Sequence, residues 1–259
     1  MKGDSLGDRM KVYEEAFNQS LPRRLPVVIR VDGRAFHTFT KGIFERPFDD
    51  GFRAAMADTA KFLCEGISGA KFAYTQSDEV SVLVTNDDKI ETQAWFDNDL
   101  SKIISLSASL ATVYFRDRIV KGNPKVDVAE RQPQFDARAF VVPHDEVCNY
   151  FVWRQRDWTR NSIQMAARAH FTQKEIQGLD NPALQEKLWK DAKVNWNDYP
   201  AMHKRGVCIV PGGKIVTTPD GETKVRGWKV DFEPPILTKE RRYVEERFRW
   251  PTPVMSKPE

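Results

Sequence analysis

Residues 27–37 are Val-Val-Ile-Arg-Val-Asp-Gly-Arg-Ala-Phe-His, and they are the stretch that best indicates the fold. Residues 27–31 are mostly β-branched, which predicts a short buried strand. The strand ends at Asp32-Gly33, where glycine permits a sharp turn or the close approach of a ligand. Residues 72–81, Phe-Ala-Tyr-Thr-Gln-Ser-Asp-Glu-Val-Ser, have a similar design, with strand-like runs on both sides of a polar turn.

Hydrophobic periodicity predicts the order strand, helix, strand, strand, helix, strand in the first half of the chain. The predicted elements are a strand at 27–31, a helix at 48–63, strands at 71–74 and 80–84, a helix at 92–115 and a strand at 135–142. This order is typical of a ferredoxin-like α+β fold, an antiparallel sheet with flanking helices. In that topology the end of the first strand and the hairpin turn share one edge of the sheet, so we expect Asp32 near Asp78.

The remaining segments are more irregular. The sequence predicts helices at 7–18, 146–155, 161–171 and 183–192, strand composition across 206–218 around a turn at 211–213, a second turn at 219–221 and a strand at 225–232. We therefore expect a catalytic core at 1–145, a helical and β-hairpin extension at 146–250 packed on it as one unit, and a disordered tail at 251–259.

Composition bounds the class of protein. The chain has 259 residues, of which 41% are hydrophobic and 30% charged, so we expect a globular protein with a sizeable core. It has no apolar run of about 18 residues and no apolar leader, so neither a membrane span nor a signal peptide is expected. Three widely spaced cysteines argue against a disulfide framework and fit the reducing cytoplasm. The net charge of +3 does not by itself indicate nucleic-acid binding.

The two acidic strand ends are candidate metal ligands. Asp32 and Asp78, with a backbone carbonyl such as that of Gly33, suit magnesium, which prefers oxygen ligands and retains water or phosphate oxygens. Two such ions would support phosphoryl transfer. The alternative is that Asp-Gly and Ser-Asp-Glu are simply turn sequences. Spacing alone leaves both interpretations open.

Several nearby residues are weaker candidates. His37 is either a catalytic group or an ordinary packed or surface histidine, and Ser77 contacts either a phosphate or its own turn. The candidate phosphate contacts are Arg34, Lys41, Arg46 and Lys102.

Residues 153–162, Trp-Arg-Gln-Arg-Asp-Trp-Thr-Arg-Asn-Ser, combine cations, aromatics and amides. That mixture suits RNA, because guanidinium and indole faces stack on bases. The alternative is the start of a helix capped by Thr159 or Asn161, with the tryptophans in the core. The chain contains no Walker A loop, dinucleotide-binding glycine pattern, zinc-protease helix or serine-hydrolase elbow.

Four motifs together are informative: Arg-Val-Asp-Gly-Arg-Ala-Phe-His at 30–37, Tyr-Thr-Gln-Ser-Asp-Glu at 74–79, Phe-Asp-Ala-Arg at 135–138 and Tyr-Phe-Val-Trp-Arg-Gln at 150–155. In this order they resemble the motifs of the tRNA-histidine guanylyltransferase family, and within it the guanylyltransferase-like branch of bacterial and archaeal 3′-to-5′ RNA polymerases. The resemblance covers about residues 27–206.

The resemblance implies a palm-type core that adds nucleotides to the 5′ end of tRNA. It implies two Mg²⁺ ions held by Asp32, the Gly33 carbonyl and Asp78, with ATP and GTP as substrates and ATP activating the 5′ monophosphate. It also implies a homotetramer. By position, the catalytic residues would be Asp32, Asp78, His37 and Ser77. The nucleotide-binding residues would be Arg34, Ala35, Phe36, His37, Arg46, Ser77 and Lys102. The RNA-binding residues would be Arg138, Trp153, Arg154, Gln155, Arg160 and Asn161.

Two departures from the family pattern bear on the substrate. Eukaryotic members have His-Ile-Asn-Asn-Leu-Tyr-Asn where residues 159–165 here are Thr-Arg-Asn-Ser-Ile-Gln-Met, and only Asn161 matches. This favours templated repair of 5′-truncated tRNA over non-templated addition of guanylate to histidine tRNA. Arg46 replaces a lysine, and the two are not interchangeable at a phosphate. The further alternatives are a nucleotidyl cyclase, whose Gly-Gly-Asp/Glu-Glu-Phe motif is absent, and an inactive RNA-binding palm protein.

Overall fold

A computed structural model describes residues 5–122, 132–218 and 221–248, and its strands form a six-stranded antiparallel sheet. The strands are β1 (Val27–Gly33), β2 (Ala70–Gln76), β3 (Glu79–Val84), β4 (Phe135–Val141), β5 (Val207–Thr218) and β6 (Gly221–Asp231). Their order is β4-β1-β3-β2-β5-β6. The first four strands have the ferredoxin-like arrangement, which confirms the predicted α+β class.

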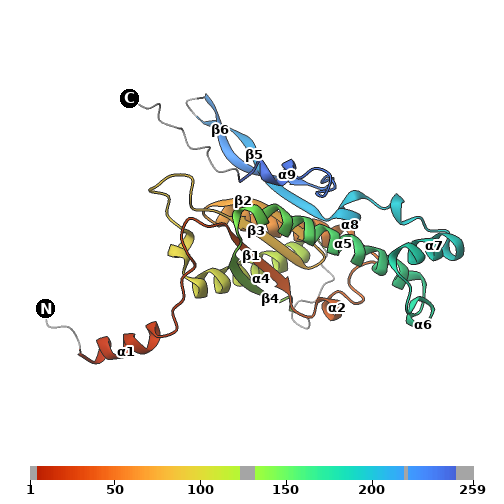
Figure 1. Ribbon diagram of the computed structural model, residues 1–259, viewed down its shortest axis with the longest axis horizontal. Coiled ribbons are helices and arrows are strands. Elements are labelled where there is room, and N and C mark those ends of the chain that lie inside the picture. The colour runs from red at the N-terminus through yellow and green to blue at the C-terminus, as the bar shows by residue number, and fades with distance from the viewer. Residues whose placement is uncertain (1–4, 123–131, 219–220, 249–259) are drawn as a thin grey trace.

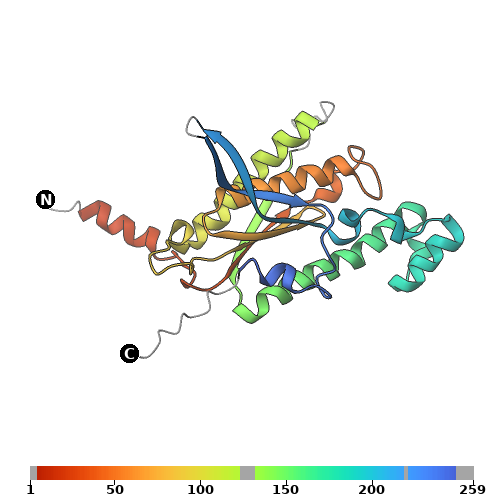
Figure 2. The same ribbon diagram turned by 90° about the horizontal axis from the view of Figure 1, so that it is seen from above.

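Helices cover both faces of the sheet. Helices α3 (Asp50–Gly66) and α4 (Leu100–Gly122) lie on one side and α5 (Val147–His170) on the other (Figure 1, Figure 2). Side chains alternate along a strand. Val27, Ile29 and Val31 therefore pack with α3 and α4, whereas Val28 packs with α5. By the same alternation Arg30 and Asp32 face α5.

The smaller helices lie mainly around this three-layered centre. They are α1 (Ser5–Glu15), α2 (Phe36–Phe39), α6 (Gln173–Ile176), α7 (Asn181–Ala192), α8 (Ala201–Arg205) and α9 (Arg242–Glu245), with short 3-10 turns at Trp95–Asn98, His144–Glu146 and Trp196–Asp198. Helix α1 projects away from the sheet and buries no residue, so Met10 and Tyr13 are exposed (Figure 1). None of the described helices is long and apolar enough to cross a membrane.

The predicted helix at 92–115 is wrong at both ends. Phe96 and Asp97 have φ of 49° and 52°, a left-handed conformation that interrupts the helix. Helix α4 starts afterwards, where the Asp99 carboxylate accepts a hydrogen bond from the Lys102 N–H at 2.9 Å, and it continues to Gly122.

The two helices predicted at 146–155 and 161–171 form one continuous helix, α5. Thr159 and Asn161 do not cap a new helix. The Thr159 hydroxyl donates to the Lys204 carbonyl at 3.1 Å, and the Asn161 amide donates to Asp157 at 3.4 Å. Both groups are satisfied within an unbroken helix, and Trp158, which precedes Thr159, is 1% exposed.

The turn predicted at Pro211-Gly212-Gly213 is a continuous part of β5. These residues pair with Trp228, Gly227 and Arg226 of β6. The pairing of β5 with β2 involves only residues 207–209, so the missing N–H of Pro211 leaves no ladder bond to β2 broken. The turn predicted at 219–221 includes residues 219–220, and these, like the predicted tail at 251–259, lie outside the described residues.

Candidate active site

The ends of β1 and the β2–β3 hairpin meet at one edge of the sheet. Asp32 pairs in register with Glu79, and the Gly33 N–H donates to the Asp78 carbonyl at 3.0 Å. The predicted proximity of the Asp32 and Asp78 sites is confirmed. Glycine is required at 33, because a Cβ there would lie 2.5 Å from the Phe36 ring.

Ser77 and Asp78 form the two-residue connection between β2 and β3. Ser77 has a φ of 46°, an uncommon left-handed conformation for a residue other than glycine. Burial raises the pKa of the Asp78 carboxyl, and the charge of Asp32 adds to this, while hydrogen bonding to Ser77 and the charge of Arg53 oppose it. Two mutually repelling carboxylates therefore face a region that favours a cation.

Glu79, the next residue, is neutralised inside the protein. Its carboxylate accepts two hydrogen bonds from Arg154, each 2.7 Å, and lies 2.6 Å from Arg30. Arg30 also donates to Asp32 at 3.1 Å. Burial raises the pKa of Glu79 while the guanidinium groups of Arg154 and Arg30 oppose the rise. This network fixes the end of β3 against α5.

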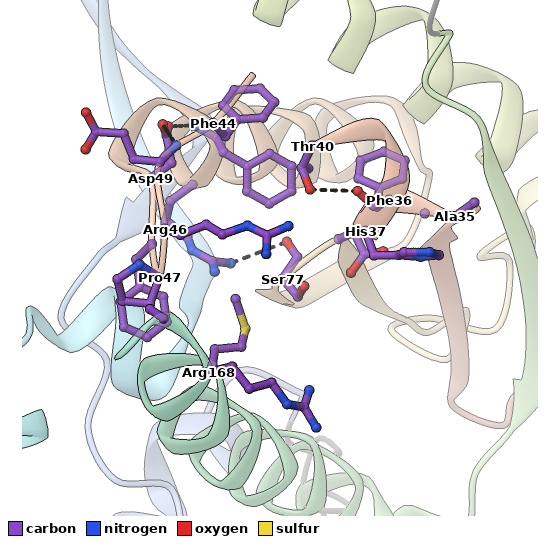
Figure 3. A pocket seen from close by; sticks show the side chains of 18 residues that line it. Ala35, Phe36, His37, Thr40, Phe44, Arg46, Pro47, Asp49, Ser77 and Arg168 are labelled. Carbon is purple, nitrogen blue, oxygen red and sulfur yellow. Dashed lines mark hydrogen bonds between the residues drawn. The ribbon is translucent and has the colours of Figure 1, made fainter. Parts of the chain in front are cut away.

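A cavity of about 460 Å³ opens beside Asp78. Its apolar wall is made by Phe36, Phe44, Pro47, Phe48 and Phe52. Arg46, Arg53 and Arg168 add positive charge, and Figure 3 shows the Arg46 side chain extending toward Ser77. This size and lining suit a small ligand with an aromatic part and an anionic part. We call it the aromatic cavity.

Arg53 is a fixed part of the wall of this cavity. It is 3% exposed, it donates to the Ser77 carbonyl at 3.4 Å and its guanidinium lies 5.0 Å from the centroid of the Trp158 ring. Burial lowers its pKa to about 10, so the side chain is still charged at neutral pH. It therefore supports the strained turn and places a positive charge behind Asp78.

A second cavity, of about 380 Å³, lies along α5. It shares Ser77, Asp78, Met165 and Arg168 with the aromatic cavity. Its other lining residues are Arg30, Asp32, Gln76, Glu79, Arg154, Asp157, Trp158, Asn161 and Gln164. Because side-chain amides are prominent in this lining, we call it the amide cavity. Ser77 and Asp78 thus stand between two cavities.

The donor set fits magnesium. In the described part of the chain no group of three or more histidine, cysteine, aspartate or glutamate side chains gathers at one point, as a closed zinc site would require. Asp32 and Asp78 provide oxygen donors only, next to cavities that could admit phosphate oxygens and water. Magnesium is commonly bound by one or two carboxylates together with substrate phosphates.

Most of the predicted site residues come together here. Gly33, Ala35, Phe36, His37, Arg46, Ser77 and Asp78 line the aromatic cavity, and Asp32 lines the amide cavity. His37 is exposed, with Nε2 3.0 Å from the Thr38 hydroxyl, and Figure 3 shows its ring directed away from the Arg46 side chain. Arg34 is exposed and donates to Gln134 at 3.0 Å.

Lys102 is not brought to this site. It stands in the first turn of α4, where the Leu100 N–H donates to the Gln19 carbonyl at 2.8 Å. Helix α4 contacts the wall of the aromatic cavity through Phe115, whose ring centroid lies 5.5 Å from that of Phe36. At 1.5 Å per residue, Lys102 is roughly 20 Å further along the helix. Lys102 therefore lies away from the aromatic cavity, and its predicted contact with a triphosphate remains a prediction.

Two predicted RNA-binding residues are internal. Arg154 is 5% exposed and held by Glu79. Gln155 is 3% exposed, donates to the Pro235 carbonyl at 2.9 Å and accepts from the Leu237 N–H at 2.8 Å. Both are held by groups of the protein itself, and their predicted contact with RNA remains a prediction. The other four predicted residues, Arg138, Trp153, Arg160 and Asn161, are accessible to solvent.

Several residues of the site carry no recognisable signal in the sequence. Arg53, Phe48 and Arg168 line the aromatic cavity from α3, the loop before it and α5, and no local pattern marks them. A signal did exist for Glu79, since an acidic residue on the buried face of a strand requires a cationic partner.

Comparisons with known proteins agree with this geometry. The sequence model of a family described as tRNAHis guanylyltransferase matches residues 7–143. The structure is similar to that of a bacterial tRNA(His) guanylyltransferase-like protein in complex with ATP, with a TM-score of 0.83 and 46% identity over 93% of this chain and 98% of that one. It is also similar to the structure of a bacterial protein of the same description in complex with GTP, with a TM-score of 0.76 and 43% identity over 94% of this chain and 98% of that one. A probable tRNA(His) guanylyltransferase of Dictyostelium discoideum is 28% identical over 211 residues, 76% of this chain and 80% of that protein.

Proposed function

Because the chain belongs to the tRNAHis guanylyltransferase family and is therefore a nucleotidyltransferase, we propose that it extends the 5′ end of tRNA in the 3′-to-5′ direction with magnesium. In this proposal the 5′ monophosphate of the tRNA attacks the α-phosphorus of ATP, so that AMP is attached to the 5′ end as the activating group and pyrophosphate is released. The 3′ hydroxyl of an incoming nucleotide then attacks the activated phosphorus and displaces the activating group. The physiological task is templated repair of 5′-truncated tRNA.

One observation carries the proposal: the acidic strand ends lie beside a cavity of nucleotide size. Asp78 and Gly33 line the aromatic cavity of about 460 Å³, and Asp32 is opposite Glu79 on the neighbouring strand. Similar proteins have been solved with ATP and with GTP. A nucleoside triphosphate needs an aromatic surface, cations and a metal site within one pocket, and this edge of the sheet offers an aromatic surface, arginine side chains and two carboxylates.

The chain's own groups have distinct roles. Asp32, Asp78 and the Gly33 carbonyl would hold two magnesium ions, which when bound neutralise phosphate charge and lower the pKa of the attacking hydroxyl. The phenylalanine wall stacks on the base, and Arg46 pairs with phosphate oxygens. Ala35, Phe36, His37 and Ser77 position the nucleotide.

We propose that the exposed residues of this region contact the tRNA. Arg138 on β4, and Trp153, Arg160 and Asn161 on α5, combine cations, an indole and an amide. Guanidinium and indole groups stack on unpaired bases, and cations bind phosphates.

Assembly as a homotetramer and a cytoplasmic location complete the proposal. Exposed Leu106, Val113 and Val120 follow each other at seven-residue spacing on α4, which suits contact between copies of a helix. Cys64, Cys148 and Cys208 are free and buried, as expected in a reducing compartment.

The test is to incubate the protein with Mg²⁺, ATP, GTP and 5′-truncated tRNAs of several identities. Templated repair predicts extension of every truncated tRNA up to full pairing with its 3′ strand, and no extension without Mg²⁺. Failure to extend any of them contradicts the proposed activity.

The second candidate is non-templated addition of one guanylate to histidine tRNA, and the names of relatives such as the Dictyostelium discoideum protein favour it. Extension restricted to histidine tRNA, irrespective of the opposing nucleotide, would establish this candidate in place of repair.

A further inference from the structure

His203 is a buried histidine to which the proposed reaction gives no role. It is 4% exposed and lies on α8, which packs against α5 (Figure 1). Its ring is stacked on that of Phe48, with the ring centroids 4.8 Å apart and the ring planes within 9° of parallel. Phe48 belongs to the phenylalanine wall of the aromatic cavity. His203 is not among the described residues that line this cavity, so it contacts the wall and not the cavity itself.

Two other aromatic rings contact Phe48, and they also come from α5 or from the chain that follows it. The Tyr199 ring meets that of Phe48 edge to face, with centroids 5.0 Å apart and an angle of 84°. The Trp158 ring does so at 6.4 Å and 65°. Contacts of this kind have preferred geometries and therefore restrict the orientation of a ring. Phe48 stands in the loop before α3, yet its orientation is set by three rings from a distant part of the chain.

The His203 ring is itself oriented by Asp50, the first residue of α3. The Nε2 atom lies 2.7 Å from Asp50 Oδ1, and because a carboxylate can only accept, Nε2 carries the proton. Burial and the charge of Arg53 lower the pKa of His203 while the hydrogen bond to Asp50 opposes this, so the ring is neutral at neutral pH. The Nδ1 atom has no hydrogen-bond partner among the described residues, so the contact with Asp50 is the polar contact that orients the ring.

The short helix that carries His203 is held in place by side-chain hydrogen bonds. The Thr159 hydroxyl donates to the Lys204 carbonyl at 3.1 Å, and the Tyr74 hydroxyl donates to the Arg205 carbonyl at 2.8 Å. The last carbonyl groups of a helix have no partner within it, so these bonds from α5 and β2 complete the end of α8. The His203 ring therefore stands on a fixed backbone and is a rigid support.

We propose that His203 is a positioning residue for nucleotide binding, whose stacked ring holds Phe48 in the orientation that receives the base. This inference rests on the proposed function, because it takes the ligand of the aromatic cavity to be a nucleotide. A ring that is already oriented loses less conformational freedom when a base stacks on it, which increases the affinity. His203 thus acts through Phe48 and does not touch the nucleotide.

Three variants separate positioning from general support of the fold. His203→Ala removes the stacked ring, and His203→Phe keeps a flat ring but loses the hydrogen bond to Asp50. Asp50→Ala releases the ring without truncating a buried side chain, since the Asp50 side chain is 78% exposed. The matched control is His170→Ala, which changes an exposed histidine beside Phe171, outside both cavities.

The measurement is isothermal titration of the full chain with Mg²⁺ and either ATP or inorganic tripolyphosphate, because only ATP has a base. We expect His203→Ala to raise the Kd for ATP about tenfold and the Kd for tripolyphosphate by less than about twofold. Asp50→Ala should raise the Kd for ATP about threefold, and His203→Phe should remain within about twofold of the original protein. The His170→Ala control should bind both ligands as the original protein does.

A double-mutant cycle tests whether His203 acts through Phe48. Phe48→Ala should raise the Kd for ATP about tenfold, because it removes part of the stacking wall. The addition of His203→Ala to Phe48→Ala should then change this Kd by less than about twofold, since the ring that His203 orients is already absent. Additive effects of the two substitutions would overturn the proposal.

Unchanged ATP affinity in His203→Ala would also overturn the proposal, as would equal weakening of ATP and tripolyphosphate binding, because a general loss of structure affects both ligands. If His203→Ala does not fold, the comparison of the two ligands in Asp50→Ala decides in the same way. Binding of ATP without any extension of tRNA by the original protein would contradict the proposed function alone. Extension by the original protein, with unchanged ATP affinity in His203→Ala, would contradict this inference alone.

Discussion

Asp78 and Glu79 are consecutive acidic residues with opposite surroundings. Glu79 is buried and bound by two guanidinium groups at 2.6–2.7 Å, whereas Asp78 forms no ion pair within the described residues and faces two cavities. The alternation of side chains along β3 turns Glu79 toward α5, and the two-residue turn leaves Asp78 at the sheet edge.

Charged residues therefore have two different roles in this fold, one structural and one in binding a ligand. The Glu79 network holds the sheet edge against α5, while the repulsion between Asp32 and Asp78 is offset in part by Arg30 and Arg53 and would be relieved further by a bound cation. The Asp32–Asp78 pair is therefore less stable when no metal is bound, and the adjacent Glu79 network supplies the rigidity that positions the pair.

Asp78→Ala should produce the largest effect. We expect 5′ extension to fall about 1,000-fold or more, because a metal ligand contributes several kcal/mol to the transition state. Single-turnover extension of 5′-truncated tRNA measures this. Asp117→Ala, which changes an exposed acid on α4, is the control and should retain full activity. Similar losses of 5′ extension in Asp78→Ala and Asp117→Ala would contradict the assignment of Asp78 as a metal ligand.

Glu79→Gln should mainly lower the stability of the folded protein. Arg154 would be left buried without its anionic partner, which lowers the free energy of unfolding by about 3–5 kcal/mol. Urea unfolding measures the change. The double variant Glu79→Leu with Arg154→Met removes both charges and should regain at least half of the loss. A single variant as stable as the original protein would show that the network is dispensable.

Arg46→Ala and Lys102→Ala compare a cation in the aromatic cavity with one roughly 20 Å away along α4. We expect the Kd for ATP to rise about tenfold in the first, through loss of a charge-assisted contact, and to change by less than about twofold in the second. Isothermal titration measures both. An equal effect of the two substitutions would place Lys102 in the site after all.

Asp78→Asn should have the smallest effect, a rise in stability at neutral pH. Burial raises the pKa of Asp78 in the folded state, so its protonation favours folding at low pH and this contribution is lost as the pH rises through that pKa. In metal-free protein the variant should have a higher Tm than the original at about pH 7, with a smaller difference at about pH 4. Asp117→Asn should show no such pH dependence. A destabilised variant at neutral pH would mean that Asp78 is satisfied internally.

Local sequence was sufficient for the strands of the core and for the edge where they meet. The β-branched run before Asp32 and the hairpin around Asp78 each carry their own signal, and their order fixed the strand arrangement. Predictions from local sequence failed where long-range contacts override the local preference. Thr159 looked like a helix cap but bonds to Lys204, and the turn at Pro211-Gly212 is paired with β6.

The amino-acid sequence by itself determined the family motifs, the ferredoxin-like order of elements and the acidic pair at one sheet edge. Only the tertiary structure decided which charged residues are available to ligands. Arg154 and Arg46 are indistinguishable as isolated side chains, yet the first, on α5, is paired with buried Glu79 and the second extends into a cavity. The physical reason is that the burial and ion pairing of a charged side chain depend on neighbours from distant segments. These neighbours decide whether the charge is neutralised within the fold or is available to bind substrate.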